Sequence, residues 1–221
     1  VSGRLDYPTV HFEAPPREGL EERLEAFINW FNHSLTDALL DPLLRAGITH
    51  LWFITLHPFD DGNGRITRTL TDLALAQMDE QSIRLYAMSP VILNKRKSYY
   101  EILEQTQKND SNITNWLVWF LDTLNDSLET TLKQIDRTLF KSQFWHKYSN
   151  LDLHEGQRKV LNRLLDGGEN GFEHGISASQ YQKVAKVSKA TATRHLSDLL
   201  GKECIIKLEG DGRNTRYQIN T

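Results

Sequence analysis

The stretch HPFDDGNGRITR, residues 57–68, decides how the rest of the chain is interpreted. It follows an apolar run typical of a buried helix end, and Gly62 and Gly64 free the backbone to turn before a second helix begins near Asn63. Amides at a helix N-terminus lack intrahelical partners and carry partial positive charge. The stretch therefore predicts a phosphate-binding loop.

The charged side chains of this stretch suit the handling of a polyphosphate. Arg65 and Arg68 are three residues apart, so they share a helix face from which two guanidinium groups can clamp phosphates. Asp61 is the expected ligand for Mg²⁺, with Asp60 as the alternative. His57 is suited to remove a proton from a hydroxyl, because the ordinary pKa of histidine is about 6.5.

Each residue also has an ordinary structural explanation. His57 suits a helix end, Phe59 a core, residues 60–62 a turn, and the arginines a solvated helix face. These explanations do not account for so many reactive groups at fixed offsets, so the functional interpretation is favoured.

The stretch resembles the signature of the Fic family, HxFx[DE]GNGRxxR, at every fixed position. The matching residues are His57, Phe59, Asp61, Gly62, Asn63, Gly64, Arg65 and Arg68. The resemblance implies a mainly α fold, a helical Fic bundle with a small β-hairpin flap, in which Phe59 anchors the core. It also implies an enzyme that transfers AMP from ATP to a hydroxyl side chain of a target protein and releases pyrophosphate. The related Doc toxins carry lysine in place of Gly64 and phosphorylate, so glycine here favours AMP transfer.

The resemblance also implies a set of site residues and the cofactors ATP and Mg²⁺. The catalytic residues are His57, Asp61, Asn63 and Arg65, and Asp61 is the metal ligand. The nucleotide-binding residues are Gly62, Asn63, Gly64, Arg65, Ile66, Thr67, Arg68, Tyr100 and Gln107. Tyr100 and Gln107 are included because KSYYE, residues 97–101, is similar to the start of the helix that lines the adenine pocket, although the family commonly has Asn where Gln107 stands.

Two further features of the family bear on this chain. VHFEAPP, residues 10–16, matches the flap on which a target protein docks, although a proline-ended loop is an equal alternative. The inhibitory glutamate of the family lies in the pattern [ST]xxxE[GN], which none of the Glu-Gly or Glu-Asn pairs meets. We therefore expect the inhibitory helix upstream of Val1 or on a partner chain.

Apolar periodicity predicts helices through the first part of the chain, which we assign as a catalytic domain over residues 1–150. The predicted helices are 20–33, 35–47, 48–56, 63–81, 90–108 and 113–148. The last contains a stripe expected to be core: Trp116, Leu117, Phe120, Leu121, Leu124, Leu128, Leu132 and Ile135.

Residues 151–221 are assigned as a winged helix-turn-helix domain. The predicted elements are helices 157–165, 178–187 and 188–200 and strands 205–208 and 215–219. Ser188 is a suitable N-cap, and a recognition helix after it would present Thr191, Thr193, Arg194 and His195.

The distribution of charged residues does not decide between DNA and protein as the partner of this domain. Residues 155–221 carry 11 Lys and Arg against 8 Asp and Glu, whereas residues 1–154 carry 15 against 21. DNA binding through the basic residues Lys183, Lys186, Lys189, Arg194, Arg213 and Arg216 is one reading. Packing on the catalytic domain or holding a protein partner is the other.

The whole chain of 221 residues has a net charge of −3 and one cysteine, Cys204, which we expect in a core. It has no apolar run long enough to span a membrane and no secretion signal, so we expect a cytoplasmic protein. A homodimer is left open. Two alternatives to AMP transfer also stay open: removal of AMP by the same site, and a DNA-binding regulator whose Fic domain senses a nucleotide.

Overall fold

The structure is a computed structural model of the whole chain. It describes residues 2–4, 7–9, 15–79, 87–108, 112–167, 172, 174–209 and 215–220. The chain divides into two compact units, Val1–Thr131 and Leu132–Thr221. The division falls inside the long helix α6 (Thr114–Lys147), whose second half belongs to the second unit. The assignment of a catalytic domain to 1–150 and of a winged helix to 151–221 stays a prediction.

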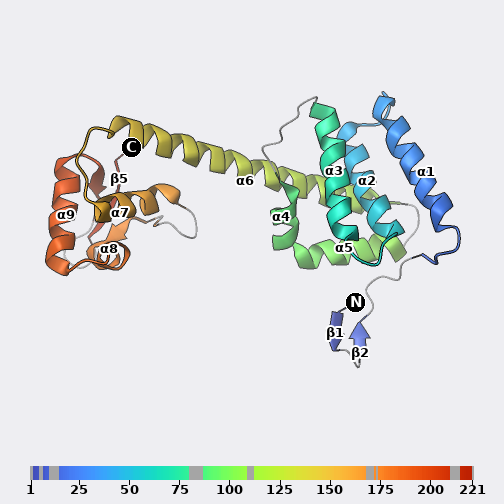
Figure 1. Cartoon of the computed structure of the whole chain (residues 1–221), viewed down its shortest axis with the longest axis horizontal. Helices are drawn as coiled ribbons and strands as arrows, with labels where there is room; N and C mark the ends of the chain where they lie inside the picture. Colours follow the sequence, from blue (N-terminus) through green and yellow to red (C-terminus); the bar gives the residue numbers. More distant parts are fainter. Residues whose placement is uncertain are drawn as a thin grey trace. The chain divides into compact units, whose positions relative to one another are not determined.

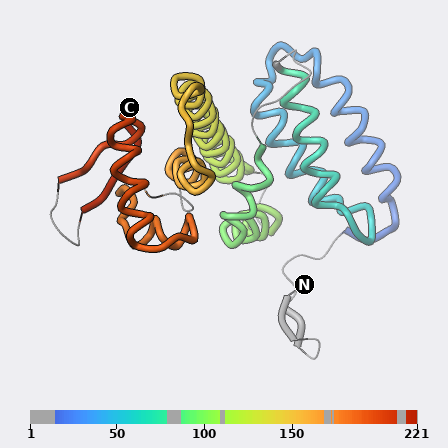
Figure 2. Tube along the Cα trace, turned by 60° about the vertical axis from the view of Figure 1, so that its left-hand side comes forward, coloured from blue at the N-terminus to red at the C-terminus, as the bar shows by residue number. Residues whose placement is uncertain are grey.

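The first unit is a helical bundle with a small hairpin, which confirms the mainly α fold. Strand β1 (Ser2–Arg4) pairs antiparallel with β2 (Tyr7–Thr9). The remaining elements are α1 (Leu20–His33), the 3₁₀ turn η1 (Ser34–Thr36), α2 (Pro42–Leu56), α3 (Asn63–Asp79), α4 (Met88–Asn94), α5 (Arg96–Lys108) and the first half of α6. Helices α1, α2 and α3 lie side by side (Figure 1), and the second view shows the same neighbours (Figure 2). Residues 10–14 of the predicted flap lie outside the described residues.

The predicted helices 35–47 and 48–56 are wrong, because the structure has one helix, α2, over residues 42–56. Asp41 caps this helix by accepting hydrogen bonds from the amides of Leu43 and Leu44. Pro42 occupies the first turn, where its missing N–H costs nothing, and it cannot continue a helix from the preceding residues. The two signals together set the start of α2.

Gly47, which suggested a helix end, lies in the middle of α2. A Cβ at this position would lie 3.0 Å from Leu117 Cδ2 and 3.1 Å from Phe120 Cδ1. The indole Nε1 of Trp116 donates a hydrogen bond to Gly47 O at 2.9 Å. Gly47 therefore allows α2 and α6 to approach closely, and it does not interrupt α2.

The core of the first unit is rich in aromatic residues, and these pack against α2. Phe27 of α1 stacks on Phe31 and packs against Phe53 of α2 at a ring distance of 5.6 Å. Trp116 and Phe120 of α6 are fully buried on the other side of α2. The α6 stripe continues into this core as far as Leu124 only.

Farther along α6 the predicted core stripe is exposed. Leu128 is 39% exposed and Leu132 is 60% exposed. Helix α6 runs to Lys147, so the prediction of a helix was correct, but the predicted burial of its residues after Leu124 was not. The predicted helix 90–108 is likewise two helices, with the break at Lys95.

Over its described residues, the second unit combines the second half of α6 and three further helices with a small sheet. Its elements after α6 are α7 (Glu155–Asp166), β3 (Ile176–Ser177), α8 (Ala178–Ala185), α9 (Lys189–Gly201), β4 (Ile205–Lys207) and β5 (Arg216–Ile219). The antiparallel sheet has the order β3-β5-β4. Strand β3 was not expected from the sequence, because two residues are too few to show alternation. Cys204 is buried in this unit, as expected.

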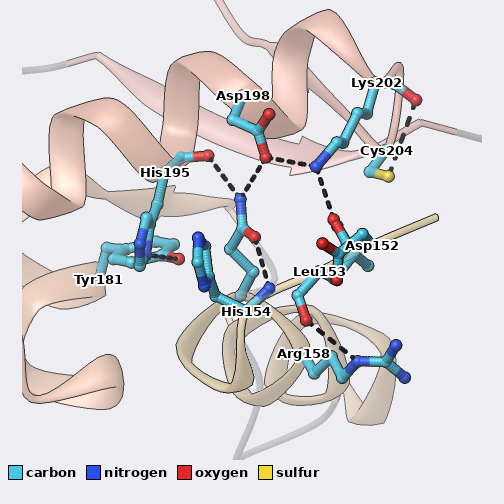
Figure 3. A network of polar contacts seen from close by, with 10 residues as sticks. Asp152, Leu153, His154, Arg158, Tyr181, His195, Asp198, Lys202 and Cys204 are labelled. Atoms are coloured by element: carbon cyan, nitrogen blue, oxygen red, sulfur yellow. Dashed lines mark hydrogen bonds and ion pairs between the residues drawn. The ribbon is translucent and has the colours of Figure 1, made fainter.

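A polar network ties the start of α7 to α9 (Figure 3). Gln157 Nε2 donates to Asp198 Oδ2 at 2.7 Å, and Lys202 Nζ donates to the same oxygen at 2.8 Å. These hydrogen bonds lower the pKa of Asp198, with that from Lys202 the largest cause. Lys202 also donates to Asp152 O, so the network fixes the segment that leads into α7.

His195, expected on the outer face of a recognition helix, is instead buried. Its Nδ1 lies 3.1 Å from Tyr181 Oη, and its ring stacks on that of His154 at 5.2 Å. Burial, followed by the charges of His154 and Arg194, lowers the pKa of His195, and Asp198 opposes this. The prediction that His195 lies on the exposed face of α9 is therefore wrong.

Among the described residues, no helix combines the length and the apolar character needed to cross a lipid bilayer.

Candidate functional site

Helix α2 ends at His57, in the left-handed conformation with φ of 47°. The His57 amide donates to Phe53 O at 3.2 Å, which closes the last turn of the helix. The ring Nδ1 lies 3.4 Å from Ile54 O, a long hydrogen bond in which the carbonyl can only accept. Nδ1 therefore carries the ring proton in neutral His57, and Nε2 is the basic nitrogen.

The loop after His57 is shaped by Asn63. Its Oδ1 accepts from the Phe59 amide at 3.0 Å, and its Nδ2 donates to Phe59 O. Asn63 is 3% exposed, so both bonds are held inside the loop. The predicted role of Phe59 as a core anchor is wrong: the residue is 47% exposed, and its ring lies 6.5 Å from that of Phe53 at the rim of the core. The loop is fixed through the backbone of Phe59.

The turn into α3 leaves backbone amides available. Gly62 has a φ of +90°, which an L-residue rarely adopts, and its carbonyl accepts from the amides of Arg65 and Ile66. No hydrogen bond between described residues uses the amides of Gly62, Asn63 or Gly64. The N-terminus of α3 is therefore a place where an anion can accept several hydrogen bonds.

The two arginines differ in their surroundings. Arg65 is exposed, whereas Arg68 is half-buried and folds back toward the start of α3. A Cβ on Gly64 would lie 3.4 Å from Arg68 Nη1, with no other heavy atom among its close neighbours. Glycine at this position therefore leaves space beside a guanidinium at the helix terminus, where phosphate oxygens would be doubly favoured.

Ile66 and Thr67, which the family resemblance placed at the nucleotide, face the protein interior. Ile66 packs against the core of the first unit. Thr67 is fully buried, and its hydroxyl donates to Asn63 O at 2.8 Å. In this chain their side chains hold the first turns of α3.

The acidic residues suit a metal ion that arrives with a nucleotide. Asp60 and Asp61 are both exposed beside the anion-binding turn. The described residues contain no group of three or more His, Cys, Asp or Glu side chains that could hold a metal ion. Mg²⁺ usually binds one or two carboxylates and fills its other positions with phosphate oxygens and water. One exposed aspartate beside a phosphate site therefore fits Mg²⁺.

Tyr100 and Gln107 lie on α5, away from the motif in sequence. The Tyr100 ring is 46% exposed, with Tyr99 at 5.4 Å on one side and the Arg96 guanidinium at 5.7 Å. Gln107 Nε2 donates to Thr55 Oγ1 at 2.9 Å, two residues before His57. Gln107 is therefore brought to the end of α2, and Tyr100 offers an open aromatic face.

A buried group that the sequence analysis missed lies behind this site. His50 is 1% exposed and contacts Thr71 Oγ1 and Tyr99 Oη. One signal in the sequence pointed to it: a single histidine two helical turns before His57 on an apolar helix.

Comparisons with known proteins agree with the motif. Residues 4–75 match the Fic/DOC family. A protein adenylyltransferase Fic of Nematostella vectensis is 34% identical over 98 residues, which cover 43% of this chain and 21% of that protein. Protein adenylyltransferase fic-1 of Caenorhabditis elegans is 34% identical over 114 residues, 49% of this chain and 21% of that protein. The matched part thus spans about a fifth of the length of these relatives.

One solved structure is also similar. It is the crystal structure of a Fic family protein from Desulfovibrio desulfuricans G20, with 20% identity and a TM-score of 0.48, covering 93% of this chain and 56% of that one. The part of the chain that matches the Fic/DOC family, residues 4–75, includes the site at the start of α3.

Proposed function

We propose that this chain is a nucleotidyltransferase that transfers AMP from ATP to a hydroxyl side chain of a target protein. The observation that carries the proposal is the juxtaposition of His57 at the end of α2 with the open amides at the start of α3. The relatives named protein adenylyltransferase support the same reaction.

In this reaction the target hydroxyl oxygen attacks the α-phosphorus of ATP, and the bond to pyrophosphate breaks. His57 Nε2 accepts the hydroxyl proton, since Nδ1 already carries one. The amides of residues 62–64 and the guanidinium of Arg68 bind and orient the phosphates, and the exposed Arg65 adds a second positive charge. Catalysis of this kind depends mostly on positioning and on charge stabilisation.

Mg²⁺ would be held by Asp61, with Asp60 as the alternative, and would neutralise phosphate charge when bound. Tyr100 would stack on the adenine, with Gln107 beside it. Docking of the target on residues 10–16 stays a prediction, because residues 10–14 lie outside the described structure.

The test uses ATP labelled at the α- or the γ-phosphate, with Mg²⁺ and a cell lysate, and compares the wild type with His57→Ala. We expect protein label from the α-position only, and its loss in His57→Ala. His33→Ala is the matched control, because His33 also ends a helix with Nδ1 against a carbonyl, that of Asn29. Label from the γ-position would mean phosphoryl transfer. Absence of any label would favour AMP removal or nucleotide sensing.

A second candidate function belongs to the second unit, which we propose is a winged helix that binds DNA through α9. The exposed side of α9 carries Lys189, Thr193 and Arg194. Its acidic residue, Asp198, is engaged by Lys202 and Gln157. This leaves the outer face of α9 net positive, which suits a phosphate backbone.

Binding to mixed-sequence duplex DNA at several salt concentrations tests this candidate. Lys189→Ala with Arg194→Ala should weaken binding and reduce the salt slope by about 0.9 per lost phosphate contact. Lys159→Ala with Arg163→Ala removes the same charge from the exposed face of α7 and is the control. Equal loss in both pairs would mean a non-specific charge effect, and unchanged binding in the first pair would remove the candidate.

A further inference from the structure

A buried chain of hydrogen bonds links three helices behind the phosphate site. His50 of α2 lies with Nδ1 3.0 Å from Thr71 Oγ1 of α3 and with Nε2 3.0 Å from Tyr99 Oη of α5. His50 and Thr71 are 1% and 2% exposed, and Tyr99 is 8% exposed. The three groups therefore exchange hydrogen bonds with one another and not with bulk water.

The donor and the acceptor in each of these hydrogen bonds follow from the protons available. The Thr71 hydroxyl donates its one proton to Thr67 O at 2.8 Å, so toward His50 it can only accept. His50 Nδ1 must then carry a proton and donate it to Thr71. In a neutral ring Nε2 is then an acceptor, and the Tyr99 hydroxyl donates to it.

The surroundings keep the ring neutral. Burial, with a smaller contribution from the charge of Arg68, lowers the pKa of His50 to about 3. Burial likewise raises the pKa of Tyr99, so the phenol keeps the proton that it donates. The His50 ring is also packed against Trp116 at 5.3 Å, an apolar contact that disfavours a charged imidazolium.

Arg68 connects this buried chain with the phosphate site. The charge of Arg68 lowers the pKa values of both His50 and Tyr99, although burial outweighs it for Tyr99. Its Nη1 lies at the start of α3 beside Gly64. Arg68 and Thr71 are three residues apart on α3, so a shift of Thr71 relative to α2 also shifts the arginine.

We propose that His50, as the neutral Nδ1–H tautomer bonded to Thr71 and Tyr99, is a positioning residue that sets α3 against α2 and α5 and thereby places Arg68 for the phosphates of the nucleotide. The kinetic part of this inference rests on the proposed function. His50 itself touches no reacting atom. It acts through the placement of Arg68, so its loss affects nucleotide binding more than the chemical step.

The experiment compares Thr71→Val, which removes the acceptor for Nδ1–H, with Thr71→Ser, which keeps it. Thr71→Val should raise the KM and the Kd for ATP about tenfold with kcat changed less than about twofold, the order of effect of partly losing a hydrogen bond to a charged group. Thr71→Ser should restore both values. Tyr99→Phe, which removes the donor to Nε2, should act in the same direction as Thr71→Val.

The matched control is Thr69→Val. Thr69 lies on the same helix and donates to the carbonyl four residues earlier, Arg65 O, at 3.1 Å, but its hydroxyl is exposed and does not contact His50. Thermal unfolding of every variant shows whether it is folded at the assay temperature. Thr69→Val should leave the KM and the Kd for ATP unchanged.

The tautomer of His50 is a readout that does not depend on activity. Nitrogen-15 NMR of histidine-labelled protein should show Nδ1 protonated and Nε2 unprotonated in the wild type, and a changed Nε2 signal in Tyr99→Phe. The opposite tautomer, or an unchanged ATP Kd in folded Thr71→Val, would overturn the inference. If the wild type transfers no AMP, the proposed function fails alone, and the tautomer and the Kd still decide this inference.

Discussion

His57 offers a test of the backbone strain at the C-terminal end of α2. Its backbone is left-handed, with φ of 47°, at the position that ends α2. This conformation costs an L-residue other than glycine roughly 1–2 kcal/mol. His57→Ala removes the imidazole and keeps the strained backbone, whereas His57→Gly removes both. Both variants lose the contacts of the imidazole, so the difference between them is the relief of backbone strain less the extra freedom that glycine gives the unfolded chain.

We expect His57→Gly to be more stable than His57→Ala by about 1 kcal/mol. In the interior of a helix the order is reversed, since glycine there is about 1 kcal/mol less favourable than alanine. The sign alone thus tests the argument. For a unit of this size the difference corresponds to a rise in Tm of roughly 3–5 °C. Both variants lack the base, so both should lose AMP transfer.

Urea unfolding followed by tryptophan fluorescence measures the difference. Four tryptophans, Trp30, Trp52, Trp116 and Trp119, lie in the first unit. Glu203 is the control: it has φ of 57° in the second unit, and its exposed side chain has no proposed part in either function. Glu203→Gly should likewise exceed Glu203→Ala in stability, with transfer retained. A His57→Ala variant as stable as His57→Gly would refute the strain argument.

Three further outcomes follow from contacts elsewhere in the chain. Asn63→Ala loses two hydrogen bonds to the Phe59 backbone, and urea unfolding should show a loss of about 1–2 kcal/mol; no loss would mean that water replaces both bonds. Gly47→Ala forces a methyl group into the contact between α2 and α6, so thermal unfolding should show a loss of about 1–3 kcal/mol, and a stabilised variant would contradict the packing. The depressed pKa of His195 means that the folded second unit binds fewer protons than the unfolded chain, so its stability should fall as the pH drops below about 6.5, the unfolded value. Trp145 fluorescence in urea reads this slope, which His195→Gln should flatten; an unchanged slope would assign it to another group.

That the candidate site residues lie together could be predicted from the sequence because the motif is local. Residues 57–68 run from the cap of α2 through one turn into the first turns of α3, so their spacing along the chain fixes their neighbourhood in space. The mainly α fold was predictable for a similar reason, since apolar periodicity marks helices wherever they pack. The start of a helix is predictable where a cap is strong, as at Asp41-Pro42, whereas Gly47 does not mark a helix end.

Burial was the property that the sequence predicted least well. Phe59 was expected inside and is half exposed, His195 was expected outside and is buried, and Leu132 was expected in the core and is exposed. Burial depends on which other elements arrive, and periodicity reports only the element itself. For His195 the deciding partner is Tyr181, fourteen residues away on another helix.

The same reasoning explains why the residues that hold the site were harder to find than the residues that form it. A reactive group must be of a particular type at a particular offset, so a pattern detects it. His50 needs only two partners of suitable polarity, and these come from α3 and α5, 21 and 49 residues away. No local pattern joins them. His50 is distinguished by the free energy needed to bury it, because a polar ring buried without hydrogen bonds would destabilise the bundle. A lone histidine on an apolar helix beside a reactive motif is therefore a reason to look for its partners before assigning it to the core.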